Sequence, residues 1–191
     1  MSKTTKVLRT LVVVGVVGGL AALGVFAAFS SQTDNPGNNV TAGTVTLADN
    51  DGGTALYDIA NAKPGSTQTS CIRVNYTGSL DADVKLFTPS TIGDLGPHVT
   101  LKVEAGTQAA PVFPVCTLFV PETTLYDDPL SDFPTTYAGG VSDYPGIAGT
   151  KWANGDAVVY RVTATPAANA PDSAQGDTTG SHVLRWEARN Q

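Results

Sequence analysis

The sequence has few residues of the types that build catalytic and metal sites, with only two histidines and two cysteines among 191 residues. Neither His98 nor His182 belongs to the His-Glu-x-x-His pattern of zinc proteases, and no Gly-x-Ser-x-Gly nucleophile turn occurs. Residue counts alone leave a Ser-His-Asp triad open, but no spacing supports one. We therefore expect no enzyme activity and no catalytic, cofactor-binding or metal-binding residues, and we interpret both histidines as solvated surface residues.

Basic side chains are also scarce, because 11 Lys and Arg stand against 17 Asp and Glu. Three of the basic residues precede Leu11, and the other eight are scattered along the chain. Binding to nucleic acid depends on clustered cations that release the counterions of the phosphates. Eight scattered cations cannot supply this term, so the composition excludes a nucleic-acid partner.

Charged residues are missing altogether from Leu11 to Phe29, a run of 19 residues. Lys3, Lys6 and Arg9 precede this run and polar residues follow it, which is the pattern of a secretory signal peptide. The run is nearly long enough to cross a hydrocarbon core of about 30 Å, so a retained membrane anchor stays an alternative. Four glycines in the run and small residues at its end favour removal, and an ordinary signal peptidase would cut after Ala27 or after Ser30.

The two cysteines, Cys71 and Cys116, both lie in the exported part of the chain, where oxidation is possible. We predict a disulfide between them, with two buried thiols as the alternative. Closing a loop of this length stabilises a fold by roughly 4 kcal/mol in the chain-entropy model.

No segment of the exported chain has a long 3.6-residue apolar period, whereas two-residue alternation recurs in short runs bounded by Gly, Pro, Asn and Asp. The pattern predicts an all-β fold with about eight strands, a two-sheet sandwich or jelly roll preceded by the N-terminal hydrophobic signal helix. The expected strands are Val40 to Leu47, Ala55 to Ile59, Thr67 to Tyr76, Val84 to Thr88, His98 to Glu104, Val112 to Val120, Ala157 to Thr165 and His182 to Arg189.

Two segments between these strands are expected to be irregular. Pro121 to Asn154 contains four prolines and is interpreted as a long surface connection with one helical turn, from which Tyr137 and Trp152 pack back onto the sandwich. Ala167 to Gly180 is interpreted as a polar hairpin loop joining the last two strands. No second core is indicated, so residues 40–191 form one domain.

Polar clusters in the loops have ordinary explanations. Asp49 to Gly53 is similar to the start of a calcium loop, but it lacks the later ligands, and a turn with positive φ angles explains it better. Asp127, Asp128 and Asp132 are interpreted as a solvated acidic loop rather than a metal site. The sequons at Asn39 and Asn75 matter only in a host that glycosylates asparagine.

Four segments, in order along the chain, carry a resemblance to a known family. They are Phe26-Ala27-Ala28-Phe29-Ser30 followed by Thr41-Ala42-Gly43-Thr44-Val45-Thr46-Leu47, then Ile59-Ala60-Asn61-Ala62-Lys63-Pro64-Gly65-Ser66, then Asn75-Tyr76-Thr77-Gly78-Ser79-Leu80 with Val84 and Leu86, and finally Leu184-Arg185-Trp186-Glu187-Ala188-Arg189-Asn190-Gln191. Together they resemble the TasA and camelysin family of prokaryotic surface and biofilm-matrix proteins. The resemblance covers roughly residues 22 to 88 and 181 to 191, and residues 89–180 do not align.

The resemblance implies a jelly-roll fold, export to the cell surface or extracellular matrix, and cleavage between Ala28 and Phe29 by a dedicated SipW-type signal peptidase. It also implies a fibre subunit whose N-terminal segment, residues 29–39, completes the sheet of the next copy. The donor-strand residues would be Phe29, Ser31, Thr33 and Asn35, and the partner would be the protein itself, head to tail. Some relatives are labelled metallo-endopeptidases, a label that no motif in this sequence supports.

We therefore predict a secreted structural protein, a fibre or pilus-like subunit. One departure from the family weakens the fibre prediction, since Phe29 to Asn39 has a single apolar side chain and contains Pro36. Such a segment offers backbone hydrogen bonds but fills few pockets. A monomeric cell-surface binding module and a secreted metallo-endopeptidase of the camelysin type are the alternatives.

Overall fold

The computed structural model describes residues 12, 39–142 and 151–190. The chain divides into two compact units, Met1–Thr41 and Ala42–Gln191, and the fold described below belongs to the second. Among the described residues, no helix has the length and apolar character needed to cross a membrane. The predicted signal peptide apart from Val12, the cleavage site at Ala28 and Phe29, and the donor-strand residues Phe29, Ser31, Thr33 and Asn35 lie outside the described residues.

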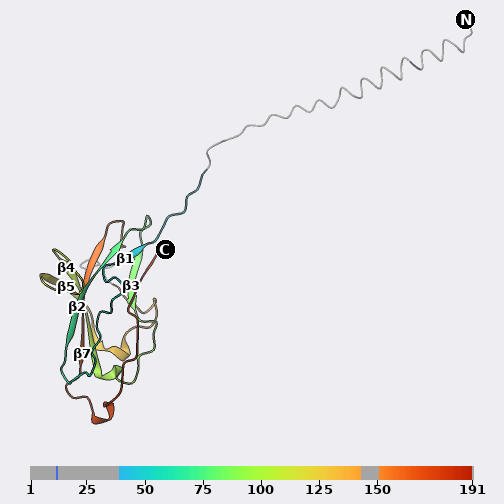
Figure 1. The fold of residues 1–191 in the computed structure, drawn as a ribbon. Helices are drawn as coiled ribbons and strands as arrows, with labels where there is room; N and C mark the ends of the chain where they lie inside the picture. The colour runs from blue at the N-terminus through green and yellow to red at the C-terminus, as the bar shows by residue number, and fades with distance from the viewer. Residues whose placement is uncertain (1–11, 13–38, 143–150, 191) are drawn as a thin grey trace, which may run out of the picture. The chain divides into compact units, whose positions relative to one another are not determined.

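The second unit is an all-β sandwich of two antiparallel sheets, as predicted (Figure 1). The larger sheet has the order β1-β2-β7-β4-β5 and the smaller sheet has the order β6-β3-β8. The strands are β1 (Leu47–Asp49), β2 (Gln68–Tyr76), β3 (Asp83–Phe87), β4 (Val99–Gln108), β5 (Phe119–Pro129), β6 (Val141–Ser142), β7 (Ala157–Pro166) and β8 (Arg185–Arg189). The short 3₁₀ helices are η1 (Gly96–His98), η2 (Leu130–Asp132) and η3 (Asp172–Ala174). This strand order does not by itself establish the predicted jelly roll.

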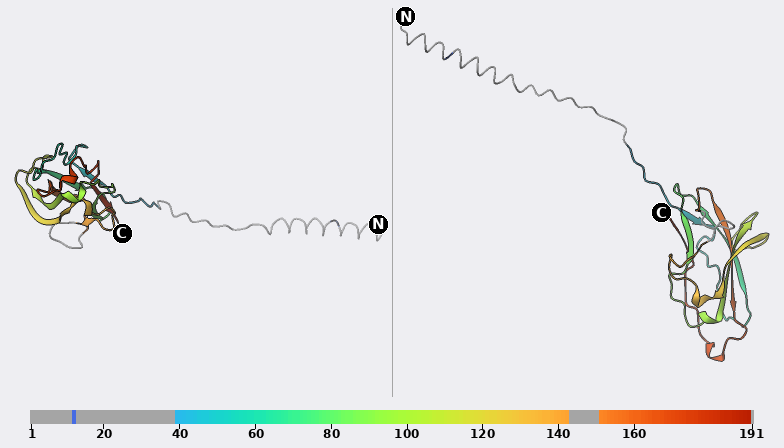
Figure 2. Two further views of the ribbon diagram at one scale, coloured as in Figure 1. Left: turned by 90° about the horizontal axis from the view of Figure 1, so that it is seen from below. Right: turned by 180° about the vertical axis from the view of Figure 1, so that it is seen from behind.

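The core lies between the sheets, which face each other in both views of Figure 2, and alternating strand residues fill it. In β2, Ile72, Val74 and Tyr76 are at most 1% exposed, whereas Arg73 and Asn75 lie on the outer face. The same alternation buries Val99, Leu101 and Val103 of β4 and turns Trp186 of β8 toward the core. The two-residue period of the sequence thus identified which face of these strands is buried.

Two aromatic residues of the proline-rich segment pack back onto the sandwich, as predicted. Trp152 is 1% exposed and exchanges two backbone hydrogen bonds with Ala82, at 2.8 and 3.0 Å. Tyr137 is 8% exposed and its hydroxyl donates to the carbonyl oxygen of Asp83 at 2.9 Å. Both residues thereby tie the long connection to the start of the smaller sheet.

The prediction of an irregular segment from Pro121 to Asn154 is wrong in its first part, because β5 runs to Pro129 and pairs with β4 along its length. Proline is tolerated in β5 because this strand forms the edge of its sheet, so that missing N–H groups need no partner. Conversely, the predicted strand Val112 to Val120 is mostly a loop, and strand pairing begins only at Phe119. The helical turn expected in this region is η2.

Three further predictions need correction. The strand predicted at Val40 to Leu47 starts only at Leu47, and Ala55 to Ile59 is not a strand. Residues Ala167 to Gly180 do not form a hairpin loop, because the strands they join, β7 and β8, belong to different sheets. Local alternation cannot show which partner a strand pairs with, and this caused the last error.

Candidate functional site

One side of the sandwich, between β2 and β8, is closed by an irregular segment rather than by a paired strand. β1 covers only the last three residues of β2, and residues 50–67 cross the remaining side. Side chains attach this crossing segment to β2. The Ser70 hydroxyl donates to the carbonyl oxygen of Leu56 at 2.5 Å, and the N–H of Asp58 donates to Oε1 of Gln68 at 3.1 Å. The backbone edge of β2 is therefore not extended by a ladder from this segment.

A groove of about 640 Å³ lies on this side, between the crossing segment and the chain that leads into β8. Its walls come from residues 51–59 and 178–186. Apolar side chains contribute much of the lining, namely those of Leu56, Ile59, Val183, Leu184 and Trp186. Val183 is 53% exposed, so the groove presents an aliphatic surface to solvent.

Tyr57 and His182 form a hydrogen-bonded pair in this groove. The Tyr57 hydroxyl lies 2.5 Å from His182 Nε2, and His182 Nδ1 lies 2.9 Å from the carbonyl oxygen of Gly180. A carbonyl oxygen can only accept, so Nδ1 carries a proton in this bond and Nε2 accepts from the tyrosine in the neutral ring. Burial raises the pKa of Tyr57 well above its ordinary value. The prediction of a solvated His182 is thus wrong, because the imidazole is half-buried with both nitrogens engaged.

Trp186 adds an unused hydrogen-bond donor to the groove. Its Nε1 is buried and has no hydrogen-bond partner in the described part of the chain. Buried polar groups are ordinarily paired. The groove could not be predicted from the sequence, because the crossing segment carries no periodic signal.

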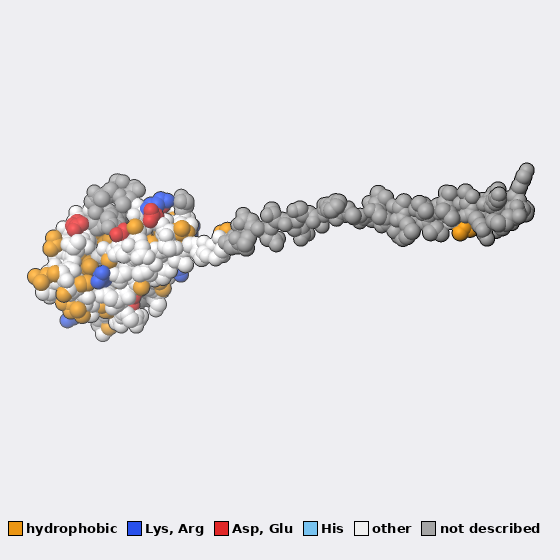
Figure 3. Space-filling view, turned by 90° about the horizontal axis from the view of Figure 1, so that it is seen from above, with side chains coloured by type: hydrophobic (Ala, Val, Ile, Leu, Met, Phe, Trp, Pro, Cys, Tyr) orange, Lys and Arg blue, Asp and Glu red, His pale blue; other side chains and the backbone are white. Residues whose placement is uncertain are grey.

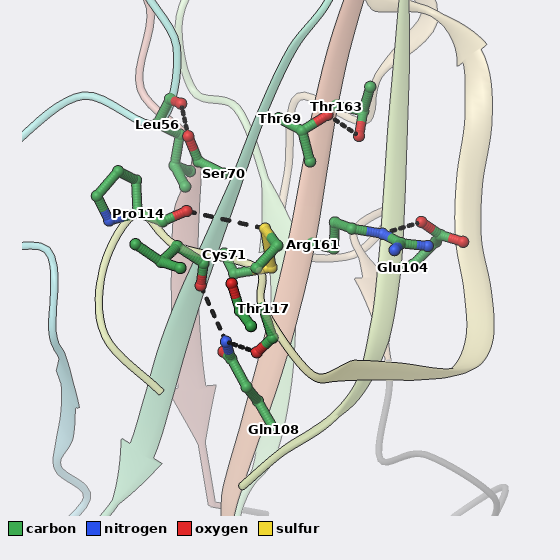
Figure 4. Close-up of a disulfide and its surroundings, with 12 residues drawn as sticks. Leu56, Thr69, Ser70, Cys71, Glu104, Gln108, Pro114, Thr117, Arg161 and Thr163 are labelled. Atoms are coloured by element: carbon green, nitrogen blue, oxygen red, sulfur yellow. Dashed lines mark hydrogen bonds and ion pairs between the residues drawn. A yellow bond between two sulfur atoms is a disulfide. The ribbon is translucent and has the colours of Figure 1, made fainter. Parts of the chain in front are cut away.

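The predicted disulfide is confirmed, since Cys71 of β2 is bonded to Cys116 with their Cα atoms 5.1 Å apart (Figure 4). The bond lies on the outer face of the larger sheet, where Cys71, Phe119 and Val159 form a small apolar cluster apart from the main core. It attaches the connection between β4 and β5 to β2, which is not adjacent to either strand.

Glu104 of β4 is a buried acidic residue. Its side chain accepts a hydrogen bond from Arg161 Nε at 2.7 Å and forms an ion pair with Lys102 Nζ at 3.4 Å. The residue is only 6% exposed. The hydrogen bond from Arg161 is the main cause that lowers the pKa of Glu104, although burial acts in the opposite direction. Glu104 and Arg161 are direct cross-strand neighbours of β4 and β7, which only the strand pairing reveals.

We expect Glu104→Gln to destabilise the domain at neutral pH by about 1.5–3 kcal/mol, the range for a hydrogen bond to a charged group. Because the folded-state pKa is lowered, the stabilisation by Glu104 is complete above the ordinary carboxyl pKa and disappears as the pH falls through the lowered value. Denaturant unfolding at pH 7 and at pH 2.5 checks this. The stability difference between the variant and the wild type should be smaller at pH 2.5 than at pH 7, and a constant difference would contradict the assignment.

Acidic and histidine residues of the described chain do not form a metal site. Asp49 and Asp51 accept hydrogen bonds from the backbone N–H groups of Asp51 and Gly53, and both glycines of the turn, Gly52 and Gly53, have positive φ, as the turn interpretation predicted. Within residues 39–142 and 151–190 no group of three or more His, Cys, Asp or Glu side chains could hold a metal ion. The disulfide and the His182 contacts engage several of the best metal-binding groups.

Comparison with known proteins agrees with the resemblance found in the sequence. No curated protein matches the chain. The family of camelysin metallo-endopeptidases matches residues 3–100, which is about half of the chain and includes the crossing segment and strands β1 to β3. The metal site that this family description implies does not fit the described residues, for the reason given above. The chain belongs to the camelysin family, which is the TasA and camelysin family that the sequence motifs indicated.

Proposed function

We propose that this protein is a non-enzymatic structural subunit that is secreted and assembles into fibres at the cell surface or in the extracellular matrix. The observation that carries the proposal is the groove on the open side of the sandwich, which has aliphatic side chains in its lining and where irregular chain takes the place of a paired strand. Sheet edges that are not covered are used for pairing with other chains in many proteins. Membership of the camelysin family supports export and a surface or matrix location.

In this proposal the N-terminal segment of one copy enters the groove of the next copy as a donor strand. β8 is an edge strand, so its outer backbone groups are available to pair with an added strand. The Trp186 indole N–H is a further donor at the groove. Phe29 is the only apolar side chain of residues 29–39, and burial of its ring among Leu56, Val183 and Leu184 contributes roughly 1.5–3 kcal/mol.

Donor and acceptor lie at different places on the chain, so the contact is heterologous and does not close on itself. Copies therefore add head to tail into an open filament. Removal of residues 1–28 by a SipW-type signal peptidase frees Phe29 as the first residue of the donor strand. The proposal thus joins the cleavage site and the groove in one assembly step.

Negative-stain microscopy of the purified mature chain, residues 29–191, tests the proposal. Filaments that form as the concentration rises are expected. A chain that stays monomeric at every concentration would favour the monomeric cell-surface binding module. Peptide-bond cleavage that a chelator abolishes would favour the metallo-endopeptidase instead.

We expect Val183→Glu to weaken filament formation without unfolding the domain. Val183 is 53% exposed and lines the groove. A glutamate at this position stays in contact with solvent, so the fold tolerates it, but its charge lies where the Phe29 ring would bind. Loss of the Phe29 contribution raises the critical concentration about 10- to 150-fold. Sedimentation of polymer at a series of protein concentrations measures the shift.

The matched control is Val120→Glu, which changes a valine of similar exposure, 57%, on β5 and outside the groove. Its critical concentration should equal that of the wild type. If both variants shift equally, net charge rather than the groove controls assembly.

A further inference from the structure

The connection between β4 and β5, residues 109–118, folds back over the larger sheet to β2; we call it the capping loop. Two bonds join it to β2 in the described structure. One is the disulfide between Cys71 and Cys116 (Figure 4). The other is a hydrogen bond from the Cys71 N–H to the carbonyl oxygen of Pro114 at 3.0 Å. The loop therefore stands where a neighbouring strand would pair with β2. Its Phe113 ring also packs against the main core.

The capping loop is ordered by bonds within itself. Gln108 Nε2 donates to the carbonyl oxygens of Val115 at 2.9 Å and of Thr117 at 2.8 Å. The N–H of Val115 donates to the carbonyl oxygen of Val112 at 2.8 Å. These bonds do not involve β2. The loop is therefore ordered by contacts that are separate from its two attachments to the strand.

The strand edge beneath the loop differs from the other long edges in having no charge. Gln68 to Ile72 of β2 has no charged residue. The β5 edge contains Glu122, Asp127, Asp128 and two prolines, and its pairing with β4 has two register shifts. The β8 edge contains Arg185, Glu187 and Arg189. Charges, prolines and bulges are the usual protection of an edge against pairing with another chain, so the β2 edge needs a different protection.

The loop itself is also uncharged and partly apolar at the surface. From Ala105 to Pro121 no residue is charged, and Val112, Val115 and Leu118 are 63%, 48% and 71% exposed. Figure 3 shows one face of the domain, on which apolar side chains lie among polar ones and charged side chains are few. Two copies that approach at this edge would meet little of the repulsion expected between acidic proteins.

We propose that the capping loop, held in place by the disulfide, blocks the edge of β2. Reduction of the disulfide then lets β2 pair with β2 of a second copy. In an antiparallel pair centred on Ser70, the facing residues from Gln68 to Ile72 are all uncharged, so like charges do not oppose one another. The N–H of Cys71, released from Pro114, becomes a donor for the added strand. This inference does not depend on the proposed donor-strand assembly.

Reduction of the disulfide between Cys71 and Cys116 is a thiol–disulfide exchange with a dithiol reductant. The thiolate of the reductant attacks Cys116 Sγ, because Cys116 is half-buried while Cys71 is only 2% exposed. The bond between the two sulfurs breaks, and Cys71 leaves as a thiolate that takes up a proton. The second thiol of the reductant then releases Cys116 as a thiol and forms the oxidised, cyclic disulfide of the reductant.

Hydrogen exchange and sedimentation velocity on the full mature chain, oxidised and reduced with dithiothreitol, at concentrations below those at which filaments form, test the inference. At concentrations where the reduced protein is still monomeric, reduction should increase the exchange rate of the Cys71 amide at least tenfold while the amides of β4 and β7 stay protected, and the Cys71 amide should become protected again as the dimer forms. Reduction should also produce a concentration-dependent dimer that is absent in the oxidised sample. The double variant C71S/C116S should behave as the reduced protein.

Thr69→Lys in the C71S/C116S background is the matched control. Thr69 is exposed on β2, so a lysine there adds the missing edge charge without disturbing the core. This variant should keep the fast Cys71-position exchange and return to the monomer. A protected Cys71 amide in the reduced monomer, loss of protection throughout the domain, or an exposed edge that stays monomeric as the concentration rises would each overturn the proposal. Donor-strand assembly affects oxidised and reduced samples equally and does not produce the difference between them.

Discussion

Deletion of Phe29 to Asn38 is expected to abolish filaments and to leave a folded, soluble monomer. The proposed donor strand supplies both the backbone pairing and the Phe29 ring to the next copy, so its removal eliminates the contact as a whole. The full mature chain should form filaments under the same conditions. Negative-stain microscopy and sedimentation compare the two chains.

The domain should keep its fold in this deletion because the contacts that hold the entering chain begin after it. Thr44 and Thr46 accept backbone hydrogen bonds from Ser79 and Thr77, both at 2.9 Å, and β1 starts at Leu47. The circular dichroism of the β-sheet should therefore be unchanged. Thr44, Thr46 and Leu47 all remain in the shortened chain.

Conditions that weaken the charge repulsion give the strictest version of this comparison. The sequence pI is about 4.6, so copies of this acidic chain repel one another least near that pH. If the shortened chain still forms the same filaments there, the donor-strand proposal is wrong. If the full mature chain stays monomeric there at high concentration, the monomeric binding module takes its place.

Trp152→Ala is expected to cost about 3–5 kcal/mol of the free energy of unfolding. Trp152 is 1% exposed and is the largest fully buried side chain among the described residues, so its truncation leaves a cavity that the surrounding core cannot fill. For a domain of this size such a loss lowers the melting temperature by roughly 10 °C. Differential scanning calorimetry or denaturant unfolding of the mature chain measures it.

Two variants serve as controls for the tryptophan. Trp152→Phe keeps most of the buried ring and should cost distinctly less than the alanine. Val112→Ala truncates a side chain that is 63% exposed and should change stability by less than about 0.5 kcal/mol. Equal losses of unfolding free energy for Trp152→Ala and Val112→Ala would show that Trp152 is not part of the core.

The sequence by itself predicted much of the sandwich because strand alternation is a local signal. The buried faces of β2 and β4 follow from a two-residue period that each strand carries within a few residues. The disulfide was predictable because the two cysteines in the part of the chain predicted to be exported have one possible pairing within it. The inward packing of Trp152 and Tyr137 was predictable because large aromatic side chains in a proline-rich connection gain most from burial.

The tertiary structure alone decided which strands pair, and the candidate sites depend on that pairing. β5 forms despite two prolines because it lies at a sheet edge, a position that the proline pattern does not reveal. Glu104 is buried and paired because β7 places Arg161 beside it, 57 residues away along the chain. The groove exists because residues 50–59 and 178–186, distant in sequence, form its two walls. Alternation reports on neighbours along one strand, whereas edges, grooves and cross-strand pairs arise from segments that only folding brings together.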